Sequence, residues 1–96
     1  MLKIQMTTVY RDWIDALRDR QARARIQVRI ERLANGNAGQ YRRISAAVSE
    51  LKIDYGPGYR VYYTEHRGEL IILLAGGDKS SQRRDIETAI MLADDL

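Results

Sequence analysis

The chain has 96 residues, 45% hydrophobic and 30% charged, so it can build one modest core but not two. It contains no cysteine and one histidine, which excludes disulfides and thiolate metal sites and argues against a histidine metal cluster. The net charge is +3 with a pI near 9.4, and 13 of the 16 basic residues are arginine. Arginine suits phosphate groups and guanine edges. This balance favours a nucleic acid or an acidic protein as partner, although a mildly basic protein without such a partner would have the same charge.

No apolar run approaches the length of about 18 residues that a membrane helix requires. The first residues also lack a charged region followed by an apolar segment, which is the pattern of a secretory signal. We therefore expect a cytoplasmic protein with no membrane contact.

The first third of the chain has the pattern of a strand followed by two helices. Residues 1–6 alternate apolar and polar side chains, as in a short strand, and Thr7 or Thr8 offers a helix N-cap. Apolar side chains then recur at helical spacing at Tyr10, Trp13, Ile14 and Leu17. Asp19 marks a break before a second helix over about 20–35, which Asn-Gly-Asn ends. We expect these helices to form a hairpin that covers one face of a sheet.

The remainder alternates strands and turns and then ends in a helix. Strands are expected at about 41–45, 47–54, 58–65 and 69–76. The Gly56-Pro57-Gly58 turn separates two of them, because proline presets φ and glycine tolerates positive φ. The last helix is expected over 80–96, capped by Ser80 or Ser81. The order βααββββα predicts a single α+β domain over 1–96, with a mostly antiparallel sheet and a C-terminal helix.

Three basic residues are expected to meet at one end of this sheet. Alternation along the strand after the turn places Arg60 and Tyr62 on the same face. Lys52 precedes the turn and Lys79 follows the next strand, so both can converge on Arg60. A cationic cluster of this kind suits a phosphodiester, since fixed cations stabilise developing negative charge and clustered cations favour the neutral form of a lysine. We expect Arg60 near the surface, outside the core.

Each of these residues also has a structural interpretation. Lys52 could be a solvated strand residue, and Arg60 could form an internal salt bridge with Glu50 or Asp78. Tyr62 could pack within the sheet, and His66 lies in an expected turn.

Several motifs resemble the RelE/ParE superfamily of type II toxins, in particular its HigB-like "addiction module killer" branch. They are SELKI, YGPGYRVYY and ILLAGGDKSSQ, and residues 22–26 and 30–37 also fit, so the resemblance covers nearly the whole chain. It implies a RelE-like fold and a ribosome-dependent mRNA endoribonuclease that acts by 2′-hydroxyl attack without a metal or cofactor. Arg60 matches the arginine of the family's GYR position, Lys79 is similar to the basic residue after the last strand, and Lys52 lies near the preceding basic position.

One departure keeps a second function open. Several RNA-cleaving relatives carry a tyrosine or histidine near the C-terminus, and the last 30 residues here contain neither. The alternative that the resemblance offers is a ParE-like, non-enzymatic inhibitor of DNA gyrase. Because ParE-like members lack the catalytic cluster, Arg60 and Lys79 favour RNA cleavage.

Further residues are candidates for RNA binding. Four arginines fall within a stripe of about 60° along the helical hairpin, where they could follow ribosomal RNA phosphates or simply form a solvated face. They are Arg18, Arg25, Arg29 and Arg32, and Tyr62 could stack on a base. The resemblance also implies partners: a HigA-like helix-turn-helix antitoxin, the ribosome with its mRNA, and operator DNA through the antitoxin alone.

Overall fold

The elements follow the predicted order, and the computed structural model describes residues 1–96. The predicted α+β class and the order βααββββα are confirmed. The elements are β1 (Lys3–Met6), α1 (Thr8–Ala16), α2 (Arg20–Ala34), β2 (Tyr41–Arg43), β3 (Ser49–Ile53), β4 (Tyr59–His66), β5 (Leu70–Gly77), a 3₁₀ turn (Lys79–Ser81) and α3 (Gln82–Asp94). None of the helices combines the length and the hydropathy that crossing a bilayer requires.

The helix starts are set by short polar side chains. The Thr7 hydroxyl accepts a hydrogen bond from the Tyr10 backbone N–H and donates one to the carbonyl oxygen of Leu74, at 2.6 Å. Asp19 caps α2 in the same way. The expectation that Ser80 or Ser81 caps the last helix is confirmed for Ser81, which is the N-cap residue of α3, although its side chain makes no capping hydrogen bond. The Asp78 carboxylate caps the 3₁₀ turn that leads into the helix.

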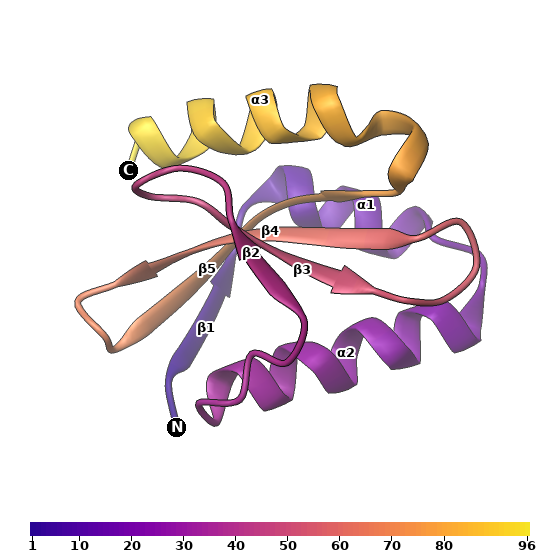
Figure 1. Ribbon diagram of the computed structural model, residues 1–96, viewed down its shortest axis with the longest axis horizontal. Coiled ribbons are helices and arrows are strands. Elements are labelled where there is room, and N and C mark those ends of the chain that lie inside the picture. The colour runs from indigo at the N-terminus through magenta and orange to yellow at the C-terminus, as the bar shows by residue number, and fades with distance from the viewer.

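The sheet has five strands in the order β1-β5-β4-β3-β2 (Figure 1). Only β1 and β5 run parallel, and the other neighbours are antiparallel, as predicted. The β4–β5 hairpin turns through residues 67–69, between the paired residues His66 and Leu70, and Arg67 and Gly68 have positive φ values of 55° and 67°. Its register shifts between Tyr62 and Tyr63, so Leu74 is an extra residue in β5.

The helices cover opposite faces of the sheet, and in Figure 1 α3 lies above it and α2 below. The predicted hairpin of α1 and α2 buries one face in a cluster of 12 residues. Its members are Tyr10, Ala22, Ile26, Ile30, Leu33, Leu51, Ile53, Tyr59, Val61, Tyr63, Ile71 and Leu73. The face under α3 has a smaller cluster of 5 residues, which are Val48, Tyr62, Leu74, Ala75 and Ala89.

Two glycines at the end of β5 let helices approach both faces of the strand. A Cβ on Gly76 would collide with the Trp13 ring of α1. A Cβ on Gly77 would collide with the Asp85 carboxylate of α3 and crowd the Ser81 hydroxyl. The two glycines therefore fix how closely α1 and α3 pack at the end of the sheet where the basic residues were expected.

Candidate functional site

The sheet register brings the three predicted basic residues to one end of the molecule. Lys52 of β3 pairs directly with Arg60 of β4, and Arg60 pairs with Gly77 of β5. The chain then continues into Lys79. Gly58, at φ +80°, lies between the two: a Cβ there would be 3.3 Å from Arg60 Nη1 and 3.9 Å from Lys79 Cβ. The structure therefore places these three residues together, with Lys79 exposed and Lys52 half-buried. We call them the basic cluster.

Arg60 is not near the surface, and that expectation is wrong. Its exposed fraction is 7%, and it belongs to the interior under α3. Its Nη1 donates to the Gly58 carbonyl oxygen at 2.7 Å, and its Nε lies 3.8 Å from Glu50 Oε2 without a hydrogen-bond partner. The salt bridge with Glu50 that the sequence left open is present, so the guanidinium is held in one place.

Glu50 is the residue of this site that the sequence analysis did not single out as functional. It is 3% exposed, and Gln82 from the first turn of α3 donates to its Oε2 at 3.1 Å. Arg42 of the edge strand β2 approaches the same carboxylate at 3.5 Å from the exposed side. Glu50 thus links two strands and a helix around Arg60. The sequence signal was its alternation with Lys52 along β3, which places both on the face of Arg60 and Tyr62.

Tyr62 lies beside this carboxylate but is fully buried under α3. Its hydroxyl has no hydrogen-bond partner. Burial, together with the Glu50 carboxylate, raises the pKa of the Tyr62 phenol well above its ordinary value. The phenol is therefore neutral at ordinary pH, and its ring is not available to stack on an RNA base in this structure.

Asp78 lies between the end of β5 and Lys79. Its carboxylate accepts hydrogen bonds from the Ser80 hydroxyl and backbone N–H, and these bonds hold the pKa of Asp78 below its ordinary value. The nearby charge of Arg60 acts in the same direction. No group of three or more His, Asp or Glu side chains is placed to hold a metal ion. Three cationic side chains at one place can bind an anion and stabilise its charge.

The helical arginines separate into different roles. Arg25, Arg29 and Arg32 line one groove of about 500 Å³ along α2, whereas Arg18 lies between α1 and α2, outside that groove. Arg25 lies over the Tyr55 ring, 4.7 Å from its centroid. The Arg29 guanidinium donates to three backbone carbonyl oxygens, those of Lys52, Ala38 and Gln40.

This internal use of Arg29 has an electrostatic consequence. Burial, together with the charge of Arg32, lowers the pKa of Arg29 from its usual value. The Arg29 guanidinium already donates hydrogen bonds to the backbone of β3 and of the loop that precedes β2, so we do not expect it to bind phosphate. The exposed members Arg25 and Arg32 remain candidates for a nucleic-acid contact.

The fold and the basic cluster define a small α+β protein with a cationic site at one end of its sheet. By sequence the chain belongs to a phage-derived family: the family model described as "Phage derived protein Gp49-like (DUF891)" matches residues 12–95. A protein of Haemophilus influenzae, described as "Uncharacterized protein", is 43% identical over 95 residues, covering 99% of this chain and 96% of the relative. No solved structure matches the chain.

Proposed function

We propose that the chain is the toxin of a type II toxin–antitoxin pair and that it cleaves mRNA on the ribosome. The observation that carries this proposal is the basic cluster: Lys52 and Arg60 are paired by the sheet register, and Lys79 lies next to Arg60 across Gly58. Membership of the phage-derived Gp49-like family is compatible with a toxin of this kind. Fixed cations at one place are what a metal-free 2′-hydroxyl attack on phosphorus requires.

The burial of Arg60 divides the roles within the cluster. Lys79 is exposed and Lys52 half-buried, so these two amines would contact the scissile phosphate and take part in proton transfer. Arg60 is held by Gly58 and Glu50 and would supply a fixed positive charge for the phosphorane. The exposed arginines of α2 would contact ribosomal RNA phosphates.

One observation favours the alternative, a non-enzymatic inhibitor of DNA gyrase. Cleavage needs an acid for the leaving 5′-oxygen, and Tyr62, the tyrosine on the same sheet face as Arg60, is buried with a raised pKa. The basic cluster would then be a binding surface alone.

A neutralising partner is part of the proposal. The resemblance to HigB-like toxins implies a helix-turn-helix antitoxin of the HigA type. That antitoxin would contact the toxin directly and repress the operon through its own DNA contacts. Co-expression of such a protein is expected to restore growth of cells that produce this chain.

The test is a brief induction of the chain in cells, with transcript 5′ ends and plasmid topology measured in the same cultures. The informative variant is Lys79→Ala, because this side chain is exposed and its removal should leave the fold intact. Lys3→Ala is the matched control, since Lys3 is exposed and pairs with Leu70 at the start of β5, whereas the basic cluster lies at the other end of that strand.

Cuts within translated messages that vanish in Lys79→Ala and persist in Lys3→Ala would support ribosome-dependent cleavage. Intact messages with trapped gyrase–DNA complexes would identify a gyrase inhibitor instead. A folded Lys79→Ala protein that inhibits growth as strongly as the parent, at matched expression, would remove Lys79 from the site.

A further inference from the structure

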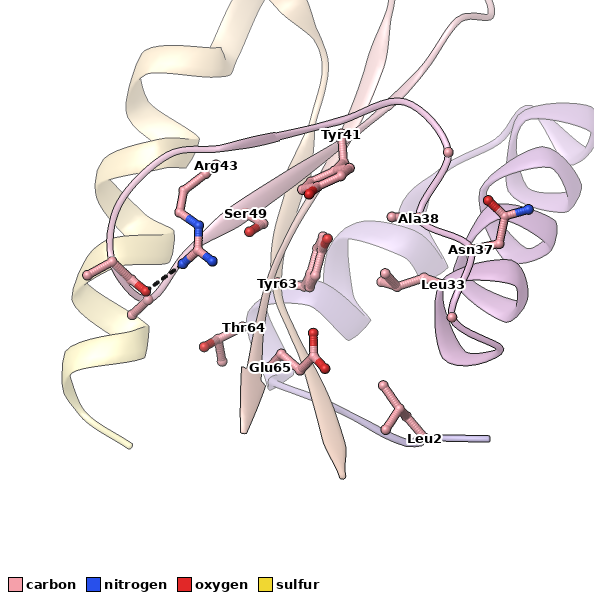
Figure 2. Close-up of a pocket in the computed structure, with 14 residues that line it drawn as sticks. Leu2, Leu33, Asn37, Ala38, Tyr41, Arg43, Ser49, Tyr63, Thr64 and Glu65 are labelled. Carbon is pink, nitrogen blue, oxygen red and sulfur yellow. Dashed lines mark hydrogen bonds between the residues drawn. The ribbon is translucent and has the colours of Figure 1, made fainter. Parts of the chain in front are cut away.

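A second cleft opens at the β2 edge of the sheet, on the face opposite the basic cluster. It has a volume of about 510 Å³ and lies between the C-terminal turn of α2, the loop that follows it and the strands β2 to β4. Figure 2 shows Tyr41 and Tyr63 in its centre, with Arg43 and Ser49 on one side and Asn37 on the other. Neither the basic cluster nor the arginine groove of α2 accounts for this cleft.

The sheet register builds the cleft wall from polar and aromatic side chains. Arg43 of β2 pairs with Ser49 of β3, and Ser49 pairs with Tyr63 of β4, so the three form a row on one face. Tyr41, two residues before Arg43, points to the same face. The Glu65 carboxylate, two residues after Tyr63, extends into the cleft below the Tyr63 ring (Figure 2).

Tyr41 is the exposed aromatic residue of this cleft. The chain has seven aromatic side chains, and Tyr41 is the one that the fold leaves exposed, at 56%. It packs in neither hydrophobic cluster. An exposed ring on the surface of a sheet, next to an arginine, is the arrangement on which single-stranded nucleic acids stack their bases.

The charged groups of the cleft specify which base would fit. Arg43 offers only donors, and its Nη1 uses one of them on the Ala46 carbonyl at 2.9 Å. The Glu65 carboxylate offers only acceptors. Guanine alone among the common bases has two adjacent donors, N1–H and the N2 amino group, to match a carboxylate. Its O6 and N7 acceptors match an arginine on the other edge.

We propose that this cleft binds an unpaired guanine of single-stranded RNA, with the base on Tyr41, its donor edge on Glu65 and its acceptor edge toward Arg43. The choice of RNA as the source of the guanine rests on the proposed function. Tyr41 is the stacking residue, a role for which Tyr62 was a candidate by sequence, although Tyr62 is buried. Arg42, exposed on β2 and directed to the opposite face, carries positive charge along the edge between this cleft and the basic cluster.

The test measures direct binding of the purified chain to fluorescent hexanucleotides in the absence of ribosomes, so it does not depend on cleavage. We expect a hexauridylate with one central guanine to bind about tenfold more tightly than hexauridylate itself. Tyr41→Ala should weaken binding of the guanine oligonucleotide about tenfold, and Tyr41→Phe should not. Glu65→Gln should abolish the preference for guanine, whereas Glu69→Gln, the same charge change in the same hairpin but outside the cleft, should preserve it.

Three results would overturn the inference. The first is an unchanged affinity of folded Tyr41→Ala, and the second is a guanine preference that survives in Glu65→Gln. The third is equally tight binding of free guanosine monophosphate, which would make a nucleotide the ligand in place of RNA. If Lys79→Ala loses toxicity and any of these three results is also found, the proposed function stands. The cleft then has no part in that function.

Discussion

The two faces of the sheet are buried by different chemistry. Under α1 and α2, all 12 residues of the buried cluster are apolar or aromatic. Under α3, the cluster has 5 residues, and beside it lie all three buried charged side chains of the chain, Glu50, Arg60 and Asp85. Only Asp85 and Ala89 of the 13 residues of α3 are buried, against five of the 15 residues of α2.

This difference indicates that one face of the sheet mainly contributes stability, whereas the other holds the polar groups of the candidate site. Burial of apolar surface without polar groups is the main favourable term in folding, so the α1/α2 face stabilises the domain. The α3 face contains two buried polar atoms without hydrogen-bond partners, Arg60 Nε and the Tyr62 hydroxyl. Each such atom destabilises a fold by about 1–3 kcal/mol, and native proteins retain them mostly where the site serves a purpose.

The largest expected effect concerns stability. Two adjacent leucines of β5 allow the contributions of the two buried clusters to be compared. Leu73 belongs to the cluster under α1 and α2, and Leu74 to the cluster under α3, and both are at most 2% exposed. We expect Leu73→Ala to lower the free energy of unfolding by about 4 kcal/mol and Leu74→Ala by about 2.5 kcal/mol. The second value is smaller because the cluster around Leu74 has 5 residues and that around Leu73 has 12, so fewer buried neighbours lose contacts. Urea unfolding of the three proteins measures both values.

Equal losses for the two leucines would mean that the size of the buried cluster does not decide the loss. The m-value of each variant serves as the internal control, because an unchanged slope shows that the native and unfolded states expose the same surface as in the parent.

The next effect concerns the buried ion pair. Glu50→Gln leaves the Arg60 charge in the interior without its carboxylate, and we expect a loss of about 3 kcal/mol in unfolding free energy. Combining Glu50→Gln with Arg60→Met removes both charges and should recover most of that loss, because the Arg60 charge is then no longer left in the interior without its partner. The double variant should nevertheless fail to arrest growth. Denaturant unfolding and growth after induction are measured on the parent, on Glu50→Gln and on the double variant.

A double variant that is stable and fully toxic would show that Arg60 serves only the fold. A double variant as unstable as Glu50→Gln would show instead that Gln82 and Arg42, the other partners of Glu50, carry the energy of this network.

The sequence predicted the elements and faces of this fold better than it predicted burial. Period-2 alternation placed Arg60 and Tyr62 on one face, and the turn at 56–58 set the register that brings Lys52 opposite Arg60. Whether that face is covered depends on how closely α3 approaches, and this approach is set by Gly77 against Asp85, two residues whose contact has no local sequence signal. The prediction of an exposed Arg60 failed for that reason.

Two further residues show the same limit. Arg29 shares its helical stripe with Arg25 and Arg32, but only the folded chain brings the carbonyls of the loop before β2 within its reach. The sequence offers no means to distinguish it from its exposed neighbours. Tyr41 was predicted within a strand over 41–45, and the strand ends at Arg43, so its exposure at an open edge follows from topology.

The smallest expected effect concerns the cap of the turn that leads into α3. Asp78 caps the turn into α3, and Asp78→Ala should lower the unfolding free energy by about 1 kcal/mol at neutral pH. Because the folded-state pKa of Asp78 is lowered, its contribution is complete above the ordinary aspartate value of about 4 and is lost as pH falls through the lower folded value. The gap between parent and variant should therefore shrink as the pH is lowered below about 4, whereas Asp54→Ala, which removes an exposed carboxylate without a hydrogen bond, should show no gap. A gap that persists at low pH would assign the attachment of α3 to packing around Ala89 rather than to the charged cap.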